Sequence, residues 1–166
     1  MAYLVGIPLI AFLAIVQSAI LSHLGILDGR PDLVLLAVVT WSLSGRAVEA
    51  MVWGWVGGML IDLLSGLPLG VSAIALVGIA YLASLTEGRF WEGHVLVPVA
   101  AVLVASLLFL AVEMAALAVS GYPLQVIPAL GRVVLPSLFL NLVLALPAAQ
   151  LAEGLRDLLY PARVTI

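Results

Sequence analysis

The sequence predicts an all-α integral membrane protein, and its composition and the form of its apolar segments support that prediction. Of the 166 residues, 65% are hydrophobic and 9% are charged, and the mean hydropathy is +1.31. A soluble domain carries about 25% charged residues, and a chain this short could not hide so much apolar surface in water. Lipid requires every backbone N–H and C=O to be satisfied within the chain, which leaves helices or a closed barrel. The apolar runs are continuous, as in LVPVAAVLVASLLFLAV, so helices are expected.

Charged residues, glycines and prolines divide the chain into six predicted transmembrane helices, all within one polytopic domain of residues 1–166. Their expected ranges are Tyr3–Leu21, Pro31–Gly45, Ala47–Leu64, Leu69–Leu85, Val95–Val119 and Arg132–Leu151. The apolar part of the second helix rises only ~20 Å, against a hydrocarbon core of ~30 Å. With the third helix it could instead form a hairpin that dips into the membrane without fully crossing it.

The distribution of arginine gives the expected orientation. The N-terminal segment lacks the positive region and cleavage site of a secretory signal, so we expect a retained first span. With the N-terminus in the cytoplasm, four arginines face the cytoplasm and two face outward, which favours both termini inside. The inner set is Arg46, Arg89, Arg156 and Arg163, and the outer set is Arg30 and Arg132.

Two segments fall outside the predicted spans. Gly121–Leu130 contains two prolines and is too short to cross, so we expect it to lie at the outer interface or to re-enter slightly. Residues 151–166 are predicted to form an amphipathic helix on the cytoplasmic surface. Leu155, Leu158 and Leu159 would then face lipid.

Polar side chains within the spans are unevenly placed. A charge in the hydrocarbon costs at least ~2.5–3.5 kcal/mol, so each one needs an explanation. In the predicted topology six polar groups from five helices share the outer half, and the inner half has almost none. They are Gln17, Asp32, Asp62, Glu113, Arg132 and Asn141. This asymmetry predicts either an outward-facing polar cavity or a polar latch that closes one.

Three of these groups also have simpler interpretations as parts of the fold. Asp32 follows Pro31 and suits the first residue of a helix, where capping and the helix dipole favour it. Gln17 and Asn141 could form interhelical hydrogen bonds worth about 0.6 kcal/mol each, without any ligand.

The charged groups can be satisfied within the protein as well. Arg132 could extend to the outer headgroups. An ion pair with Arg30 or Arg132 would satisfy Asp62 or Glu113. Ligand contact and structural pairing therefore both stay open for these residues.

The third predicted helix carries small residues at a spacing of four. Ala50, Gly54 and Gly58, followed by Asp62, share one helix face. Small residues let another backbone approach closely, so we expect a helix-packing face, which could receive a partner helix. We expect the four tryptophans to act mostly as interfacial anchors. These are Trp41, Trp53, Trp55 and Trp91.

The sequence offers little chemistry, so we expect no catalytic residue, no cofactor and no metal site. There is no cysteine, and the two histidines, His23 and His94, fall on opposite sides of the predicted membrane. No histidine or lysine is placed to activate a serine, and no phosphate-binding Gly-Lys-Ser/Thr loop occurs. No basic patch exists to bind nucleic acid. We therefore expect a protein that is not an enzyme.

Two segments resemble a known family when they are read together. Gly29–Leu36 contains Pro-Asp followed by an aliphatic run, and Trp55–Gly70 fits G-x-x-x-x-D-x-x-x-G-x-P-x-G. The pair resembles the bacterial rod shape-determining membrane protein family MreD. The matching positions are Pro31, Asp32, Gly57, Asp62, Gly66, Pro68 and Gly70, with Gln17 in the first helix. The Gly-Leu-Pro-Leu-Gly segment predicts a tight turn directly after Asp62.

The resemblance implies a six-helix protein of the bacterial cytoplasmic (inner) membrane, similar in fold to the S-components of energy-coupling-factor vitamin transporters. It further implies a non-catalytic scaffold of the cell-elongation complex that binds the transmembrane helix of MreC. Through MreC it would work with RodA, a class B penicillin-binding protein and MreB to support peptidoglycan synthesis and cell shape.

Two other functions stay open on the sequence. An S-component-like subunit would capture a small solute from outside, which the outer polar groups could serve. A channel or proton-coupled carrier could use Glu113 and Asp62, but it lacks a polar path across the inner half. A homodimer through small-residue faces is also compatible with the sequence.

Overall fold

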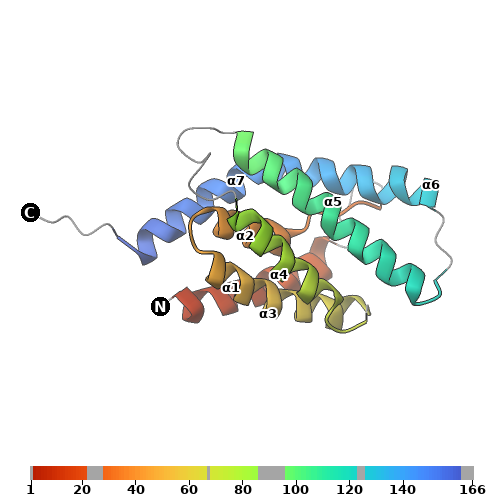
Figure 1. Ribbon diagram of the computed structural model, residues 1–166, viewed down its shortest axis with the longest axis horizontal. Coiled ribbons are helices and arrows are strands. Elements are labelled where there is room, and N and C mark those ends of the chain that lie inside the picture. Colours follow the sequence, from red (N-terminus) through yellow and green to blue (C-terminus); the bar gives the residue numbers. More distant parts are fainter. Residues whose placement is uncertain (1, 22–27, 67, 86–95, 123–125, 162–166) are drawn as a thin grey trace, which may run out of the picture.

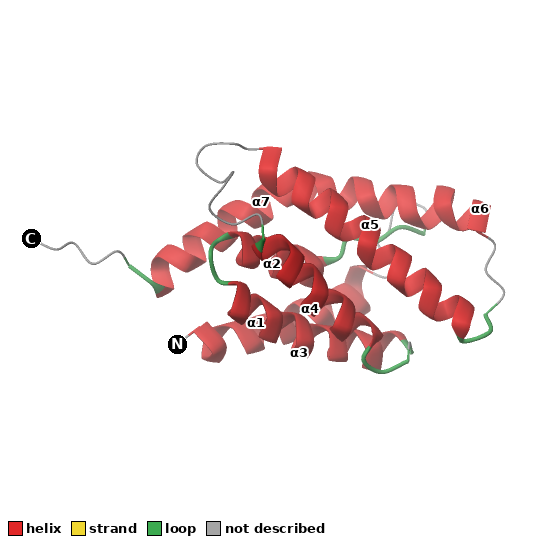
Figure 2. Cartoon of the chain, in the orientation of Figure 1, coloured by secondary structure: helices red, strands yellow, loops and turns green. Residues whose placement is uncertain are grey.

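The computed structural model describes residues 2–21, 28–66, 68–85, 96–122 and 126–161, and every regular element within these ranges is helical (Figure 2). This confirms the all-α prediction. The elements are α1 (Ala2–Val16), η1 (Gln17–Leu21), α2 (Leu33–Leu43), α3 (Ala47–Ser65), α4 (Val71–Ser84), α5 (Leu96–Val119), α6 (Val126–Ala129), η2 (Leu130–Val134) and α7 (Leu135–Leu159). Both η segments are π-helical turns joined directly to an α-helix.

The main helices alternate in direction along one long axis, so the molecule has two distinct ends (Figure 1). The end that we call the Tyr160 end contains the start of α1, the turn between α2 and α3, and the last turn of α7. The opposite end, the Asp32 end, contains η1, the start of α2, the turn between α3 and α4, and the last turns of α5. All six polar residues that the sequence singles out lie toward the Asp32 end.

Helix α2 lies at the centre of the bundle. Nine of its eleven residues are buried, and it contacts α1, α3, α4, α5 and α7. A helix that is apolar on all sides is expected to be buried in this way. Eleven residues rise only about 16 Å, roughly half of the hydrocarbon thickness of a bilayer. Helix α2 is therefore a core helix to which the longer helices are fastened.

The helices differ in whether they are long enough to cross a membrane. By length and composition three of the described helices qualify, namely Ala47–Ser65, Leu96–Val119 and Ile127–Leu159. Three further apolar helices are shorter, namely Tyr3–Ala19, Leu33–Leu43 and Val71–Ser84. The sequence predicts six spans, and the doubt it raises about the second one agrees with the 11-residue length of α2.

The small residues of α3 are buried against α4. A Cβ atom on Gly58 would lie 2.3 Å from the Cα of Ala73, and one on Gly54 would lie 3.2 Å from the carbonyl carbon of Leu76. Ala50 is fully buried in the core. Because α4 already occupies this face, the expectation that it could receive a partner helix is wrong. The five-residue connection between α3 and α4 places α4 there.

The tryptophans correct a second expectation. Trp41 and Trp53 are buried in the core, where their rings stack with centroids 4.5 Å apart. Helix α1 packs so closely on Trp53 that a Cβ on Gly6 would lie 2.1 Å from the indole ring. These two residues are therefore not interfacial anchors. Trp55 is half exposed, and Trp91 lies outside the described residues.

Residues 127–159 form one long helix where the sequence predicts three separate segments, namely an interfacial segment, a span and a surface helix. Residues 127–159 are continuously helical, so the described part of Gly121–Leu130 from Ile127 onward begins the last helix. No separate surface helix begins near Leu151, because α7 continues through that point. Leu155 and Leu159 pack on the hydrophobic core, and only Leu158 of the three predicted lipid-facing leucines is largely exposed.

Replacing Gly58 by alanine is predicted to destabilise the protein by ~1–3 kcal/mol, because the new Cβ overlaps the backbone of α4. Gly78→Ala is the matched control, since Gly78 lies in α4 with open space around it, and this change should be neutral or stabilising by ~0.5–1 kcal/mol. Thermal unfolding of both variants in detergent measures the difference. Equal unfolding temperatures would show that α3 and α4 are not in such close contact.

Candidate functional site

The first turn of α2 presents a physical problem, because a helix begins with backbone N–H groups that have no partner within the helix. Each such group left unpaired in apolar surroundings costs about 1–3 kcal/mol. The side chain of Asp32, which precedes α2, makes no hydrogen bond to its own helix. Other helices supply the acceptors. The Val34 N–H donates to Oε1 of Gln17 (3.2 Å), and the Asp32 N–H donates to Oδ1 of Asn141 (2.8 Å).

The same two amide side chains also hold the carboxylate of Asp32. Nε2 of Gln17 donates to Oδ1 of Asp32 (3.2 Å), and Nδ2 of Asn141 donates to Oδ2 (3.3 Å). Each amide therefore bridges the carboxylate and a backbone N–H at the start of α2, one amide coming from η1 and the other from α7. Asp32 is thus the centre of an interhelical network, and it acts as more than a local capping residue.

Further hydrogen bonds extend this network to α5 and along the start of α7. The Asn141 amide nitrogen also donates to Oγ of Ser106 on α5 (3.0 Å). The Arg30 N–H donates to Oγ of Ser137 (3.0 Å). We call the side chains that make these bonds, to one another or to the backbone of residues 30–34, the Asp32 network. It comprises Gln17, Asp32, Ser106, Ser137 and Asn141. The network joins four helical elements at one point.

Sequence reasoning places Gln17, Asp32 and Asn141 in one region, but it misses the two serines. Ser137 lies four residues before Asn141, so both share one face of α7, and this spacing could have identified it. Ser106 has no comparable signal, because its partner lies on another helix. Pro31 is buried and has no N–H group, so the packed entry to α2 contains one donor fewer to satisfy.

Asp62 lies at a different place from the Asp32 network and has a different role. Its Oδ2 accepts the N–H of Gly70 (2.7 Å), and its Oδ1 accepts the N–H of Ser72 (3.1 Å). The carboxylate at the end of α3 therefore caps the first turn of α4, where the helix dipole also favours a negative charge. Of the two alternatives that the sequence leaves open for Asp62, the ion pair with Arg30 or Arg132 does not form.

The residues that follow Asp62 complete the turn to α4. Gly66 ends α3 with φ +73° and its N–H donates to the Asp62 carbonyl oxygen (3.1 Å), while Gly70 begins α4 with φ +96°. Both angles lie in the left-handed region that glycine adopts without strain. The Pro68 carbonyl accepts the N–H of Val71 (3.3 Å). The spacing D-x-x-x-G-x-P-x-G is thus the spacing of a carboxylate that caps the next helix. The longer pattern begins with Gly57, which lies close to α2. A Cβ atom added there would lie 2.6 Å from Cγ1 of Val34.

Glu113 and Arg132 stand apart from both arrangements. Glu113 lies half-buried on α5, and no residue in the described ranges forms a hydrogen bond or ion pair with its carboxylate. The side chain of Arg132 in η2 is exposed, and only its backbone takes part, accepting the N–H of Asp28 (3.1 Å). The ion pair with Arg30 or Arg132, which the sequence leaves open as one alternative for Glu113, is therefore absent as well.

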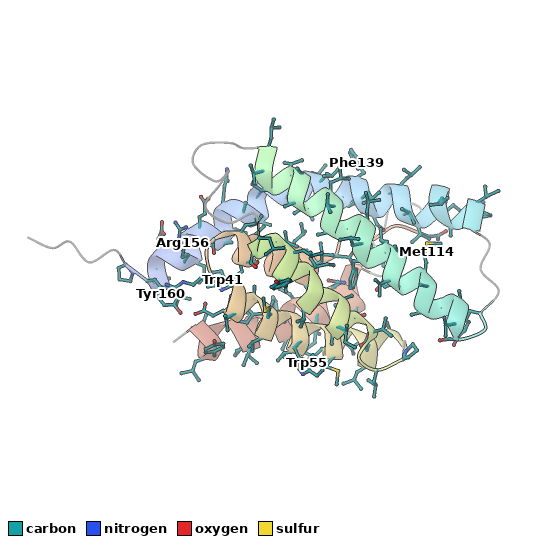
Figure 3. All side chains as sticks on the ribbon, viewed as in Figure 1. Trp41, Trp55, Met114, Phe139, Arg156 and Tyr160 are labelled. Carbon is teal, nitrogen blue, oxygen red and sulfur yellow. The ribbon has the colours of Figure 1, made fainter. Side chains whose placement is uncertain are left out.

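A second polar cluster, at the Tyr160 end, was not predicted. Glu49 is 9% exposed and accepts hydrogen bonds from Nε1 of Trp41 (3.0 Å) and from the hydroxyl of Tyr160. The guanidinium of Arg46 lies 3.4 Å from the centre of the Tyr160 ring and 3.9 Å from the Glu49 carboxylate. The hydrogen bond to Glu49 raises the pKa of the Tyr160 hydroxyl above its ordinary value. This cluster fastens the end of α7 to the turn between α2 and α3 (Figure 3).

Two grooves on the molecule are apolar. One, of about 440 Å³, is lined by α1, α2, α3 and α7, with Trp41 and Pro147 among its residues. The other, of about 350 Å³, lies between α4 and α5 and includes Leu82 and Val104. Neither is lined by Asp32, Asp62, Glu113 or Asn141. These two grooves therefore do not provide the polar cavity that the sequence suggests as one of its alternatives.

In the described ranges the polar side chains of the site form hydrogen bonds that hold helices together. Within the described ranges no three His, Asp or Glu side chains come together as metal ligands. Ser106 and Ser137 are bound to Asn141 and to the Arg30 N–H, with no base beside them. His23 and His94 lie outside the described residues.

The Asp32 network is predicted to behave as one cooperative unit. Gln17→Ala and Asn141→Ala should each destabilise the protein by ~1–2 kcal/mol. The double variant should deviate from additivity by ~0.5 kcal/mol or more, because both amides hold the same carboxylate. Thermal unfolding measures all three variants, with Ser120→Ala as control, since the exposed Ser120 hydroxyl bonds only within its own helix. Strict additivity would show that the two amides act independently.

Asp62 is predicted to matter for stability through two backbone N–H groups. Asp62→Ala leaves both without an acceptor and should cost ~1–3 kcal/mol. Asp62→Asn keeps one acceptor oxygen and should fall between the wild type and the alanine variant. Asp157→Ala removes an exposed carboxylate and serves as control in the same unfolding experiment. If the two alanine variants were equally stable, Asp62 would not cap α4.

Comparison with known proteins identifies the family. A family model described as rod shape-determining protein MreD matches residues 1–152 of the 166. No curated protein and no solved structure matches the chain. The match covers most of the sequence, including η1, the entry to α2 and the turn after Asp62, so the chain belongs to the MreD family of rod shape-determining membrane proteins.

Proposed function

We propose that this MreD-family chain is a non-catalytic scaffold of the bacterial cell-elongation complex, which binds the transmembrane helix of MreC. Through MreC it would support peptidoglycan synthesis by RodA and a class B penicillin-binding protein, in coordination with MreB. The chain would lie in the cytoplasmic membrane as a multi-pass protein of six helices with both termini in the cytoplasm. The arginine distribution and the family membership support this placement.

The observation that carries the scaffold proposal is that three carboxylates accept hydrogen bonds from other groups of the chain. Asp32 receives two amide donors, Asp62 receives two backbone donors, and Glu49 receives an indole and a phenol donor. Groups bound in this way hold helices together and have little capacity left for a substrate. The two grooves are lined mainly by apolar side chains and offer few polar contacts for one. A protein built in this way is suited to holding other proteins.

The second candidate function is an S-component-like subunit that captures a small solute from outside. The observation that favours it is Glu113, a carboxylate without a partner in the described residues at the end where such a site would open. A bound solute would need further polar contacts, and in the described structure Gln17, Asp32 and Asn141 are already committed to one another. The scaffold is therefore the better-supported proposal.

Affinity capture of the tagged full chain from its own membranes, after crosslinking, tests the two functions against each other. The scaffold predicts recovery of MreC together with the wall synthases. Another multi-pass protein of the same membrane, carrying the same tag, is the control for abundance. Recovery of paired ATPases with a coupling subunit, or of a bound small solute, would instead establish the transporter function and refute the scaffold.

A further inference from the structure

Glu113 lies on the face of α5 that packs into the bundle. Val102, Ser106, Phe109 and Glu113 follow one another at spacings of three or four residues, so they form one stripe along the helix. Val102 and Ser106 are fully buried and Phe109 is 1% exposed. From Glu113 onward the stripe is only half-buried, at Leu117 as well. The inward-facing side of α5 is thus no longer fully buried toward the Asp32 end, and Glu113 is the first residue of the stripe that is partly exposed.

Three of the carboxylates in or beside the apolar helices are each served by two donors from the chain itself. This holds for Asp32, Glu49 and Asp62. Glu113 receives none from the described residues. An unpartnered carboxylate within the hydrocarbon is costly, and such groups usually mark a functional contact. The contrast indicates that the donor for Glu113 comes from outside the described chain.

The electrostatic surroundings of Glu113 favour a positively charged or donor group. The nearby charges that act on it are those of Asp32, Asp62 and Arg30. Two of the three are negative, and the one positive group forms no ion pair with Glu113. A cation or a strong hydrogen-bond donor placed at Glu113 would therefore be stabilised, and an anion such as a lipid phosphate would be repelled.

We propose that Glu113 is the polar anchor of a helix-docking surface, formed by Glu113, Ala116 and Leu117 on α5, and that its occupant is a partner's transmembrane helix carrying an arginine, lysine or other donor side chain at that depth. This rests on the function proposed above and specifies the contact with the helix of MreC. The surface replaces the buried glycine face of α3 as the docking site.

The depth of Glu113 and its apolar neighbours select a helix as the occupant. Glu113 lies six residues before the end of α5, which places it about 9 Å from that end of the helix. Met114, its neighbour in sequence (labelled in Figure 3), packs on an apolar cluster of Leu110 from α5, Val134 from η2 and Leu138 from α7. A lipid acyl chain would cover the apolar surface but brings no donor, whereas a helix with one polar residue supplies both kinds of contact.

Co-purification of the full chain with MreC tests the anchor. Glu113→Leu should lower recovery of MreC about tenfold, because a charge-assisted hydrogen bond is lost, and Glu113→Gln should lower it less. Glu153→Gln, which neutralises a half-buried carboxylate on α7 toward the Tyr160 end, is the matched control and should leave recovery unchanged. The purified Glu113 variants should unfold at the wild-type temperature or higher, since no described intramolecular bond is lost.

Site-specific photocrosslinking supplies the second measurement. A photoreactive residue at Leu117, on the stripe of Glu113, should crosslink to MreC, and the same residue at Ala115, on the opposite exposed face of α5, should not.

The outcomes separate the two proposals. If the wild type recovers MreC and the Glu113 variants recover it equally well, the anchor is refuted and the scaffold function stands. If the wild type recovers no MreC, both the anchor proposal and the scaffold proposal are refuted. If the purified wild type instead retains a small amine that Glu113→Gln no longer binds, the occupant is a solute and the helix proposal is refuted.

Discussion

The start of α2 is the point on which the rest of the structure depends. A helix of eleven residues in the centre of an apolar bundle cannot turn its first N–H groups to water, so acceptors must come from its neighbours. Gln17 and Asn141 provide them, and their amide nitrogens hold Asp32 at the same time. Because Gln17 must reach the start of α2, this requirement sets the place where α1 gives way to η1. Asn141 likewise sets the position of α7 beside residues 30–32, and its bond to Ser106 sets the position of α5. The short central helix thus aligns the longer ones around it.

The same requirement is met once more at the start of α4, by a different solution. There the capping group is Asp62 from the preceding helix, and the two glycines let the chain turn tightly enough for its carboxylate to meet the N–H groups of Gly70 and Ser72. A third carboxylate, Glu49, joins α2, α3 and the end of α7 at the opposite end. These three carboxylates therefore act as hydrogen-bonded links between helices.

Much of this arrangement could be read from the sequence, and the errors have a common cause. Composition and continuous apolar runs predict the helices because the period and length of such runs depend only on local sequence. The gathering of Gln17, Asp32 and Asn141 follows from helix direction alone. Which donor meets which acceptor does not follow, because it depends on helix rotation and packing. For that reason the sequence leaves an ion pair open for Asp62, whose carboxylate in fact accepts backbone N–H groups eight and ten residues further along.

The errors on α3 and on the tryptophans show the same limit. Small residues every four positions predict a close helix approach, which the Gly58–Ala73 contact shows, but the pattern does not say whether the approaching helix belongs to the same chain. The short connection to α4 was the signal that could have decided it. Tryptophan is enriched at membrane interfaces on average, yet the indole N–H of Trp41 has a buried acceptor in Glu49, and its ring stacks on Trp53. The general preference of tryptophan for the membrane interface does not hold where a buried hydrogen-bond acceptor and a stacking partner are present.

The need for a distinguishing polar contact follows from the solvent itself. In lipid, burial of apolar surface gives a helix no advantage over an acyl chain, because both are equally apolar. The grooves beside Pro147 and between α4 and α5 can therefore discriminate only by shape. A chain that has used most of its polar groups internally can recognise a particular helix through a group left unpaired. Glu113 is such a group, since no described residue forms a hydrogen bond or ion pair with it. Glu113 lies where the buried stripe of α5 becomes partly exposed. A partner can therefore reach it, and the Asp32 network stays intact.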